Sequence, residues 1–319
     1  MKRMLGAVTG LFISVHIFAA SATELDFEAA KAGAEKGDAK AEYALAKCYA
    51  HGSGVERDWG KAAEYLHKSA EQGNALAQTD IAALYAKGLG VKQDFAEAFK
   101  WYLKAAEQGD SLAQFAVGEC YRSGRGITKD PAEAVKWYQK SADRRQPEAQ
   151  NALGQCYFRG EGVERNYGEA VKWLRSAAEQ GYVGAMNNLG FLCENGLGTK
   201  PDFGEAAKWY QAGAEQGDAK AQSNLGRLYE DGTGVPHDFV LAYKWFKLSA
   251  MQNDPVGRRY VETYEDRRRL NSTQQKEAEH LINEYLSEHG PWKQVTKNAP
   301  PAAVQATNQA AVTQAKTGN

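Results

Sequence analysis

The chain has 319 residues, of which 43% are hydrophobic and 25% charged, values typical of a soluble globular protein with a sizeable core. Its formal net charge of −1 offers no basic face of the kind that nucleic acid binding needs, so no nucleic acid partner is expected.

The first residues have the order of a secretory signal peptide. Two basic residues precede a mostly apolar stretch over 5–18, and Ala20 and Ala22 fit the small-x-small cleavage rule. We therefore predict a signal peptide over 1–22 and an exported chain, periplasmic or secreted, that begins at Thr23. Because the apolar stretch is shorter than the roughly 20 residues of a membrane span, no span is expected in the mature chain, and an uncleaved anchor is the alternative.

From residue 37 onward the sequence repeats every 36 residues without insertion or deletion. Every repeat carries a Gly-x-Gly pair at one position, and five of the six begin with glycine. The six predicted repeats are 37–72, 73–108, 109–144, 145–180, 181–216 and 217–252. A fixed period of this length predicts a stacked array of helix or strand units, and such arrays generally act by presenting a surface.

Each repeat predicts a helix–turn–helix pair. In the last repeat, Ala221, Leu225 and Leu228 form the apolar stripe of a first helix. Gly232 is expected to end that helix, because glycine tolerates the left-handed conformation. A good N-cap residue then starts a second helix in all six repeats: Asp58, Asp94, Asp130, Asn166, Asp202 and Asp238. Four repeats have glutamate three residues later, where a capping-box partner is expected: Glu97, Glu133, Glu169 and Glu205.

Large rings and cysteines recur at fixed positions. The second helices carry one ring in register: Tyr65, Trp101, Trp137, Trp173, Trp209 and Trp245. Since packing needs every repeat alike and a ligand needs only one site, this ladder is interpreted as core. Cys48, Cys120 and Cys156 share a position that is leucine elsewhere, so they are interpreted as small core residues. Helix spacing disfavours disulfides and leaves Cys156–Cys193 as the least improbable pair.

The two ends of the array depart from the repeat. A capping helix is predicted within 23–36, and capping helices are predicted within 253–290, the last of them N-capped by Ser272 or Thr273. The remaining segment, 291–319, is mostly rich in Ala, Gln, Thr and Asn, and it is predicted to be a disordered tail.

The repeat resembles the Sel-1-like repeat, a tetratricopeptide-related family, over 37–252. In the last repeat the resemblance is carried by Ala221, Leu225, Gly226, Tyr229, Gly232, Gly234, Val235, Asp238, Ala242, Trp245 and Ala250. It implies an all-α fold, a right-handed superhelical solenoid whose first helices line the concave side. It also implies an adaptor or regulatory role, because family members scaffold membrane-associated complexes, modulate signalling or mediate bacterial contact with host cells.

Three positions of the first helix vary freely between repeats. They are spaced four and three residues apart, so they share one helix face that points away from the apolar stripe. This face is the predicted concave binding face, with candidate residues Tyr43, Lys47, Phe115, Glu119, Arg122, Asn151, Gln155, Phe158, Asn187, Phe191, Glu194, Ser223, Arg227 and Glu230. Phe115, Phe158 and Phe191 are apolar where a solvated surface would be polar, which is typical of interface anchors. The alternative is that these rings pack against the adjacent repeat.

No catalytic or metal-binding motif accompanies the repeats. The patterns H-E-x-x-H, C-x-x-C, G-x-S-x-G and S-x-x-K do not occur in the sequence, and a predicted helix precedes each Gly-x-Gly where a dinucleotide loop would need a strand. We therefore expect no catalytic residue, no cofactor and no metal. The sequence favours a monomeric, non-enzymatic scaffold for a protein or peptide, one associated with a membrane or the cell wall.

Two other functions stay open at this point. One is an enzyme or binding protein directed at the cell wall or β-lactams, although no repeat holds the paired cysteines of the family members linked to penicillin binding. The other is an architectural spacer that reaches its partner through the tail.

Overall fold

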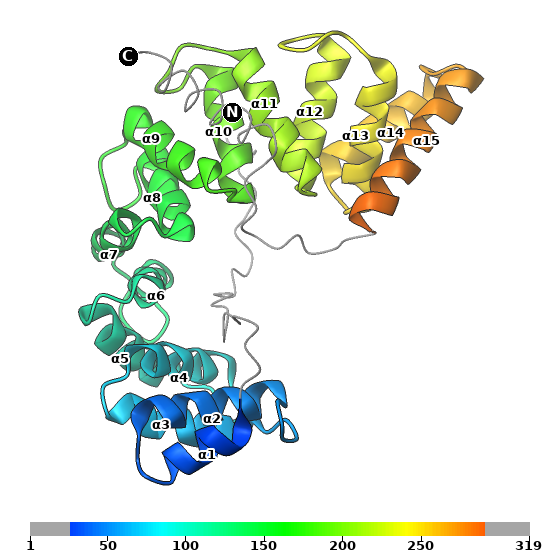
Figure 1. The fold of residues 1–319 in the computed structure, drawn as a ribbon. Helices are drawn as coiled ribbons and strands as arrows, with labels where there is room; N and C mark the ends of the chain where they lie inside the picture. Colours follow the sequence, from blue (N-terminus) through cyan, green and yellow to red (C-terminus); the bar gives the residue numbers. More distant parts are fainter. Residues whose placement is uncertain (1–25, 291–319) are drawn as a thin grey trace, which may run out of the picture. The chain divides into compact units, whose positions relative to one another are not determined.

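The computed structural model describes residues 26–290, which form fifteen α-helices in two compact units (Figure 1). The first unit ends at Ala149 and the second begins at Gln150. No strand occurs within 26–290, and the predicted all-α solenoid is confirmed. The predicted signal peptide and the predicted tail lie outside the described residues.

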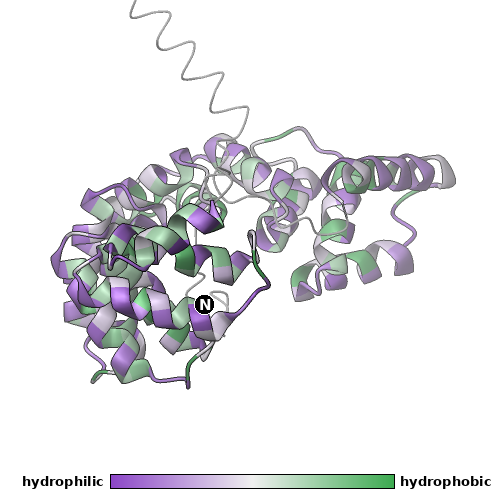
Figure 2. Cartoon of the chain, turned by 60° about the horizontal axis from the view of Figure 1, so that its bottom comes forward, coloured by the Kyte–Doolittle hydropathy of each residue, from purple (hydrophilic) through white to green (hydrophobic). Residues whose placement is uncertain are grey.

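Each repeat contributes two helices of thirteen residues. The first helices are α2 (Ala39–His51), α4 (Ala75–Lys87), α6 (Ser111–Ser123), α8 (Pro147–Arg159), α10 (Val183–Asn195) and α12 (Ala219–Asp231). The second helices are α3 (Trp59–Glu71), α5 (Phe95–Glu107), α7 (Pro131–Asp143), α9 (Tyr167–Glu179), α11 (Phe203–Glu215) and α13 (Phe239–Met251). The array is preceded by α1 (Phe27–Ala34) and followed by α14 (Pro255–Asp266) and α15 (Ser272–His289). Hydrophobic and hydrophilic residues occur on the same helices, as expected for amphipathic elements (Figure 2).

Helix ends largely follow the predicted turn chemistry. The Asp or Asn predicted before each second helix accepts a hydrogen bond from a backbone N–H of its first turn. Gly52 ends α2 in the left-handed conformation, with φ of 75°. The prediction for α15 was wrong by one residue: Asn271 is the N-cap, because its side chain and that of Gln274 form a reciprocal capping box.

The glutamates expected in capping boxes bind cations instead. Glu97 accepts a hydrogen bond from Lys100 at 2.9 Å, and the same i,i+3 ion pair recurs in α7 and α9. Glu205 accepts a hydrogen bond from Arg175 Nη1 at 2.6 Å. The carboxylates therefore point to a neighbouring cation and not back to the N-cap, which is the difference from the prediction.

Within a repeat, the first helix places a small residue against a large side chain of the second helix. A Cβ atom added to Gly118 would lie 2.6 Å from the ring of Tyr138, and one added to Gly190 would lie 2.7 Å from the ring of Tyr210. Both tyrosines are fully buried. The two helices therefore approach so closely that this position accepts only a small residue.

Within single repeats, side-chain hydrogen bonds that join the second helix, or the residue after it, to the first helix recur at a separation of thirty residues. Gln108 Nε2 donates to Gln78 Oε1 at 2.7 Å, and Gln180 Nε2 donates to Gln150 Oε1 at 2.6 Å. Serines of three second helices donate to a carbonyl at the start of the preceding first helix: Ser69 to Ala39, Ser141 to Ser111 and Ser249 to Ala219. The constant separation shows why the period tolerates no insertion.

The aromatic ladder is buried in three of its six positions. Trp101, Trp209 and Trp245 are at most 8% exposed. The other three rings are half-buried and lie beneath lysines; Lys140 Nζ, for example, is 3.7 Å from the centroid of Trp137. Lysines also lie over two of the buried rings, Trp101 and Trp245, so the ladder combines burial with cation–π contacts.

The four cysteines lie in the core as free thiols. Burial raises the pKa of Cys120 and Cys193 to about 12, so both thiols are protonated at neutral pH. The Cys156–Cys193 bond that the spacing left open is not formed in the described structure. The thiols act as small apolar side chains.

Two glycines with the same backbone conformation test how tightly the loops are held. Gly126 and Gly37 both have φ of +75°, but a Cβ on Gly126 would lie 2.0 Å from the carbonyl oxygen of Phe95, whereas nothing lies within 4 Å at Gly37. Gly37→Ala should lower the free energy of unfolding by about 1–2 kcal/mol, the cost of the left-handed conformation. Gly126→Ala should cost clearly more, measured by urea unfolding of both variants. Equal losses would show that the loop moves freely.

Candidate functional site

The three variable positions of the first helices form what is called here the first-helix surface. In the first unit its residues are Tyr43, Lys47, Ala50, Thr79, Ala83, Ala86, Phe115, Glu119 and Arg122. In the second unit they are Asn151, Gln155, Phe158, Asn187, Phe191, Glu194, Ser223, Arg227 and Glu230. Their environments divide them into residues held by internal partners and residues that remain available to a ligand.

In the first unit, the first of the three positions, held by Tyr43, Thr79 and Phe115, is used for internal packing. The hydroxyl of Tyr43 donates to Asp80 Oδ2 at 3.0 Å, and Thr79 is only 2% exposed. Phe115 is 5% exposed, and its ring lies 5.8 Å from that of Tyr138. Phe115 therefore has the packing role that the sequence left open as the alternative to binding.

Glu119 is the centre of a closed polar cluster. It is 5% exposed, and Arg122 donates to both of its oxygens, from Nε at 2.9 Å and from Nη2 at 2.6 Å. The hydroxyl of Tyr138 donates to the same carboxylate. A buried charge needs such partners, so Glu119 and Arg122 stabilise each other and leave little hydrogen-bonding capacity for a ligand.

The second unit builds a similar cluster from different positions. Glu194 accepts hydrogen bonds from the hydroxyl of Tyr210 at 2.9 Å and from Nη2 of Arg227, in the next repeat, at 2.5 Å. Burial and the neighbouring carboxylate raise the pKa of Tyr210, so the phenol keeps its proton and donates. Glu230 is paired with Arg269 in the same way. These charges join neighbouring helices.

Amide side chains connect the first helices of the second unit. Asn188 Nδ2 donates to Asn151 Oδ1 at 3.2 Å, and Asn224 Nδ2 donates to Asn187 Oδ1 at 2.9 Å. Ser223 is 3% exposed. The first of the three positions thus holds neighbouring repeats together in this unit as well.

A pair of phenylalanines is the main apolar feature left on the first-helix surface. Phe158 and Phe191 are half-buried and meet edge to face, with ring centroids 6.1 Å apart. Phe158 also lies 5.7 Å from the ring of Tyr167. Gln155, nearly one turn before Phe158, is half-buried too. Aromatic rings fixed by neighbours beside a polar amide are suited to protein contacts.

A buried phenol, that of Tyr102, lies beneath this surface and was not predicted from the sequence. Tyr102 occupies the position of the two tyrosines in the polar clusters and is 1% exposed, but its hydroxyl has no hydrogen-bond partner in the described structure. On its first helix, Ala83 and Ala86 stand at the positions that supply glutamate in the clusters. On this helix the repeat pattern drew attention to the neighbouring ring of Trp101 and not to the phenol of Tyr102.

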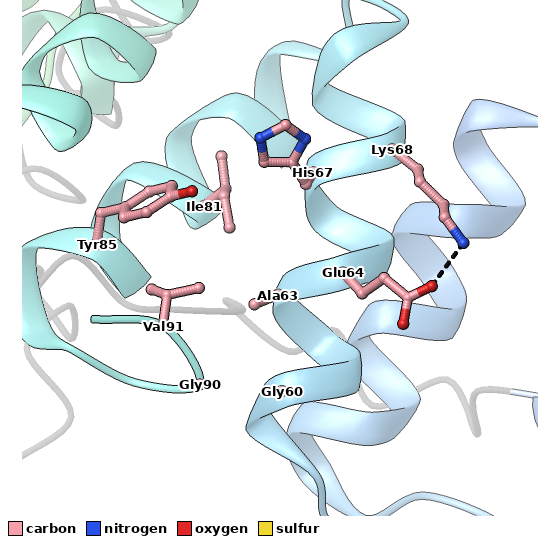
Figure 3. A pocket seen from close by; sticks show the side chains of 9 residues that line it. All are labelled: Gly60, Ala63, Glu64, His67, Lys68, Ile81, Tyr85, Gly90 and Val91. Atoms are coloured by element: carbon pink, nitrogen blue, oxygen red, sulfur yellow. Dashed lines mark hydrogen bonds and ion pairs between the residues drawn. The ribbon is translucent and has the colours of Figure 1, made fainter. Parts of the chain in front are cut away.

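A pocket of about 400 Å³ uses none of the residues of the first-helix surface (Figure 3). It lies between α3, α4 and the loop after α4, and it is lined by Gly60, Ala63, Glu64, His67, Lys68, Ile81, Tyr85, Gly90 and Val91. An ion pair between Glu64 and Lys68, 2.7 Å long, stands at its edge. The sequence contained a hint of the pocket, since Ala63 occurs where the next repeat has phenylalanine.

Within residues 26–290, no group of three or more His, Cys, Asp or Glu side chains is placed to hold a metal ion. None of the described helices is both long and apolar enough to cross a membrane.

The buried phenols allow a matched test of the polar clusters. Tyr138→Phe removes a donor from the buried carboxylate of Glu119, so we expect it to lower the free energy of unfolding by about 1–3 kcal/mol. Tyr102→Phe removes an unpartnered hydroxyl and should be neutral or stabilising. Urea denaturation of the two variants measures both. A loss at Tyr102 as large as that at Tyr138 would mean that its hydroxyl has a structural partner.

Comparison with known proteins agrees with this architecture. The Sel1 repeat model matches six consecutive segments: 39–74, 75–110, 111–145, 147–182, 183–218 and 219–254. Sel1 repeat proteins generally act as protein–protein interaction scaffolds. A comparison with curated proteins gives no match.

Two solved structures are similar over most of this chain. One is a protective antigen of uropathogenic Escherichia coli strains with an SLR fold, which is 30% identical over 92% of this chain, with a TM-score of 0.74. This chain covers 65% of the length of that antigen. The other is a Sel1 repeat protein of Oxalobacter formigenes, which is 34% identical over 75% of this chain and 94% of its own, with a TM-score of 0.64. With six matched repeats and these structural likenesses, the chain belongs to the Sel1 repeat family.

Proposed function

We propose that the protein is a non-enzymatic scaffold that binds a peptide or protein on its first-helix surface, in the periplasm or outside the cell. The observation that carries this proposal is the Phe158–Phe191 pair, because two rings fixed edge to face and only half-buried present apolar area beside the amide of Gln155. Rigid aromatic anchors of this kind supply much of the affinity in protein interfaces.

The polar clusters support the same proposal indirectly. Glu194, Arg227 and Tyr210 hold one another, so the helices beneath the aromatic pair are fixed before a partner arrives. A surface that is rigid in advance loses less conformational entropy on binding. The surface is therefore suited to recognising a defined partner.

Export is proposed from the sequence alone. The basic residues at the start, the apolar stretch over 5–18 and the small residues Ala20 and Ala22 support cleavage after Ala22. The absence of a disulfide among the four described cysteines is compatible with export to an oxidising compartment. All four are buried, and each lies in a different repeat.

Export predicts a defined mature N-terminus. Protein recovered from the periplasmic or secreted fraction of its native host should begin at Thr23, measured by mass spectrometry of the intact chain. Replacing Ala20 and Ala22 together by lysine should block cleavage and leave the precursor, because the peptidase accepts only small residues there. Recovery of a chain that begins at Met1 from the exported fraction would contradict cleavage.

Binding on the first-helix surface predicts where crosslinks form. A photo-crosslinking amino acid at Gln155 should capture a partner in cells, whereas the same group at Lys208, an exposed residue of α11 in the same unit, should not. Gln155 is preferred over the phenylalanines because neither ring is changed and the fold is preserved. Adducts are detected by mass shift on gels and identified by mass spectrometry.

A tail deletion separates this function from an architectural spacer. Removal of 297–319 should leave the Gln155 adduct unchanged if the partner lies on the first-helix surface. Equal capture from Gln155 and Lys208, or loss of the adduct on removal of the tail, would instead support attachment through the tail.

A further inference from the structure

The pocket between α3 and α4 is open because of three residues of α3. In this repeat they are Gly60, Ala63 and His67, all lining the pocket. Thirty-six residues later, at the same positions of α5, they are Ala96, Phe99 and Leu103. The first repeat is therefore smaller or more polar than the second at each of three positions that face one space, and the fifth repeat shares its glycine and alanine as Gly204 and Ala207.

Phe99 shows which group occupies this space in the next repeat. Its ring is 8% exposed and meets the ring of Tyr121 edge to face, with centroids 5.5 Å apart and planes at 87°. Tyr85 is the counterpart of Tyr121, and it faces Ala63 across the pocket (Figure 3). The wall that receives a phenylalanine ring is thus present in the first repeat, while the ring itself is replaced by a methyl group.

The rest of the wall that contains Tyr85 is built alike in both repeats. Ile81 and Val91 are apolar, as are the residues thirty-six positions later. Gly90 lies between the wall and the start of α3, where an added Cβ would be 2.0 Å from the carbonyl oxygen of Trp59. This contact holds the loop in place, so the pocket is preformed and does not depend on a rearrangement.

Charge at the rim also distinguishes this repeat. Glu64 stands at a position that is lysine in the five other repeats: Lys100, Lys136, Lys172, Lys208 and Lys244. Its carboxylate is 56% exposed and bonded to Lys68, which is 48% exposed. Glu71, 3.3 Å from His67, adds a second acid on the same helix. Exposed ion pairs are weak and exchange readily, so Glu64 favours a cationic residue beside the pocket.

We propose that this pocket binds an aromatic side chain of a protein partner, one that is followed or preceded by a basic residue. The ring enters beside Ala63 and meets Tyr85 edge to face, as Phe99 meets Tyr121 in the next repeat. The basic residue lies next to Glu64. The site is separate from the first-helix surface, so this inference goes beyond the proposed function and does not require it.

A fluorinated peptide tests the pocket directly. The probe is acetyl-Gly-Ser-Lys-(4-fluorophenylalanine)-Gly-Ser-amide, observed by ¹⁹F NMR while the mature full chain is added to concentrations on the order of millimolar, the range expected for a single anchor. We expect a saturable shift or broadening that unlabelled Ac-GSKFGS competes away and Ac-GSKAGS does not. Equal competition by the alanine peptide, or no saturable change, would overturn the proposal.

Substitutions in the protein locate the site. Ala63→Phe should weaken binding at least tenfold, because it fills the pocket with the ring found in the next repeat, and its melting temperature should not fall. Leu76→Phe, a ring added at an exposed position of the same unit, should leave binding unchanged. Should Ala63→Phe bind the probe as tightly as the unaltered chain, the ring does not enter this pocket.

Charge reversal tests the basic neighbour. Glu64→Lys should weaken the lysine-containing peptide at least threefold and leave a peptide with glutamate in place of that lysine unaffected or stronger. A variant that binds both peptides alike would remove the role of the rim charge. Crosslinking from Gln155 should persist in Ala63→Phe, so that failure of this pocket and failure of the first-helix surface are read separately.

Discussion

The close contact between a small residue of each first helix and a large side chain of its second helix determines the rest of the structure. At Gly118 and Gly190 there is no room for a Cβ atom, because the rings of Tyr138 and Tyr210 lie where it would be. This contact sets the distance between the two helices of a pair. The thirty-residue hydrogen bonds join the same two helices and fix their geometry further, in agreement with the constant period of 36 residues.

The same contact decides which surface residues are free to bind. A tyrosine ring packed beneath the first helix brings its hydroxyl to that helix's outer face, and a buried hydroxyl needs an acceptor. Glu119 and Glu194 meet that need, and Arg122 and Arg227 in turn balance their charges. Part of the variation on the first-helix surface is therefore a response to the core beneath it, which leaves Phe158, Phe191 and Gln155 as residues available for the proposed recognition.

The sequence was sufficient for the period, the helix pairs, the apolar stripes and the N-caps of the second helices, because each rests on contacts within one repeat. It was insufficient where the environment of a side chain depends on which of several neighbours it contacts. Phe115 looked exposed by helical spacing, yet the ring of Tyr138 covers it. Glu97 had the spacing of a capping box, yet its carboxylate pairs with Lys100. The pocket beside Ala63 depends on the absence of a ring, and a stretch of sequence considered by itself does not reveal an absence.

Repetition makes such absences visible, since each repeat is a template for the others. A residue that departs from the template has one of two consequences. Where a neighbour compensates, as Arg227 does for Glu194 from the next repeat, the departure is structural. Where the side chain is small, as at Ala63 opposite Tyr85 and again at Ala207, the space that Phe99 occupies in the second repeat is not filled by that position. Closing that wall would require only a larger side chain at Ala63, which helix packing in the next repeat already accommodates as Phe99. The pocket is therefore a difference in side-chain size on a common backbone, and this is the feature on which its proposed ligand depends.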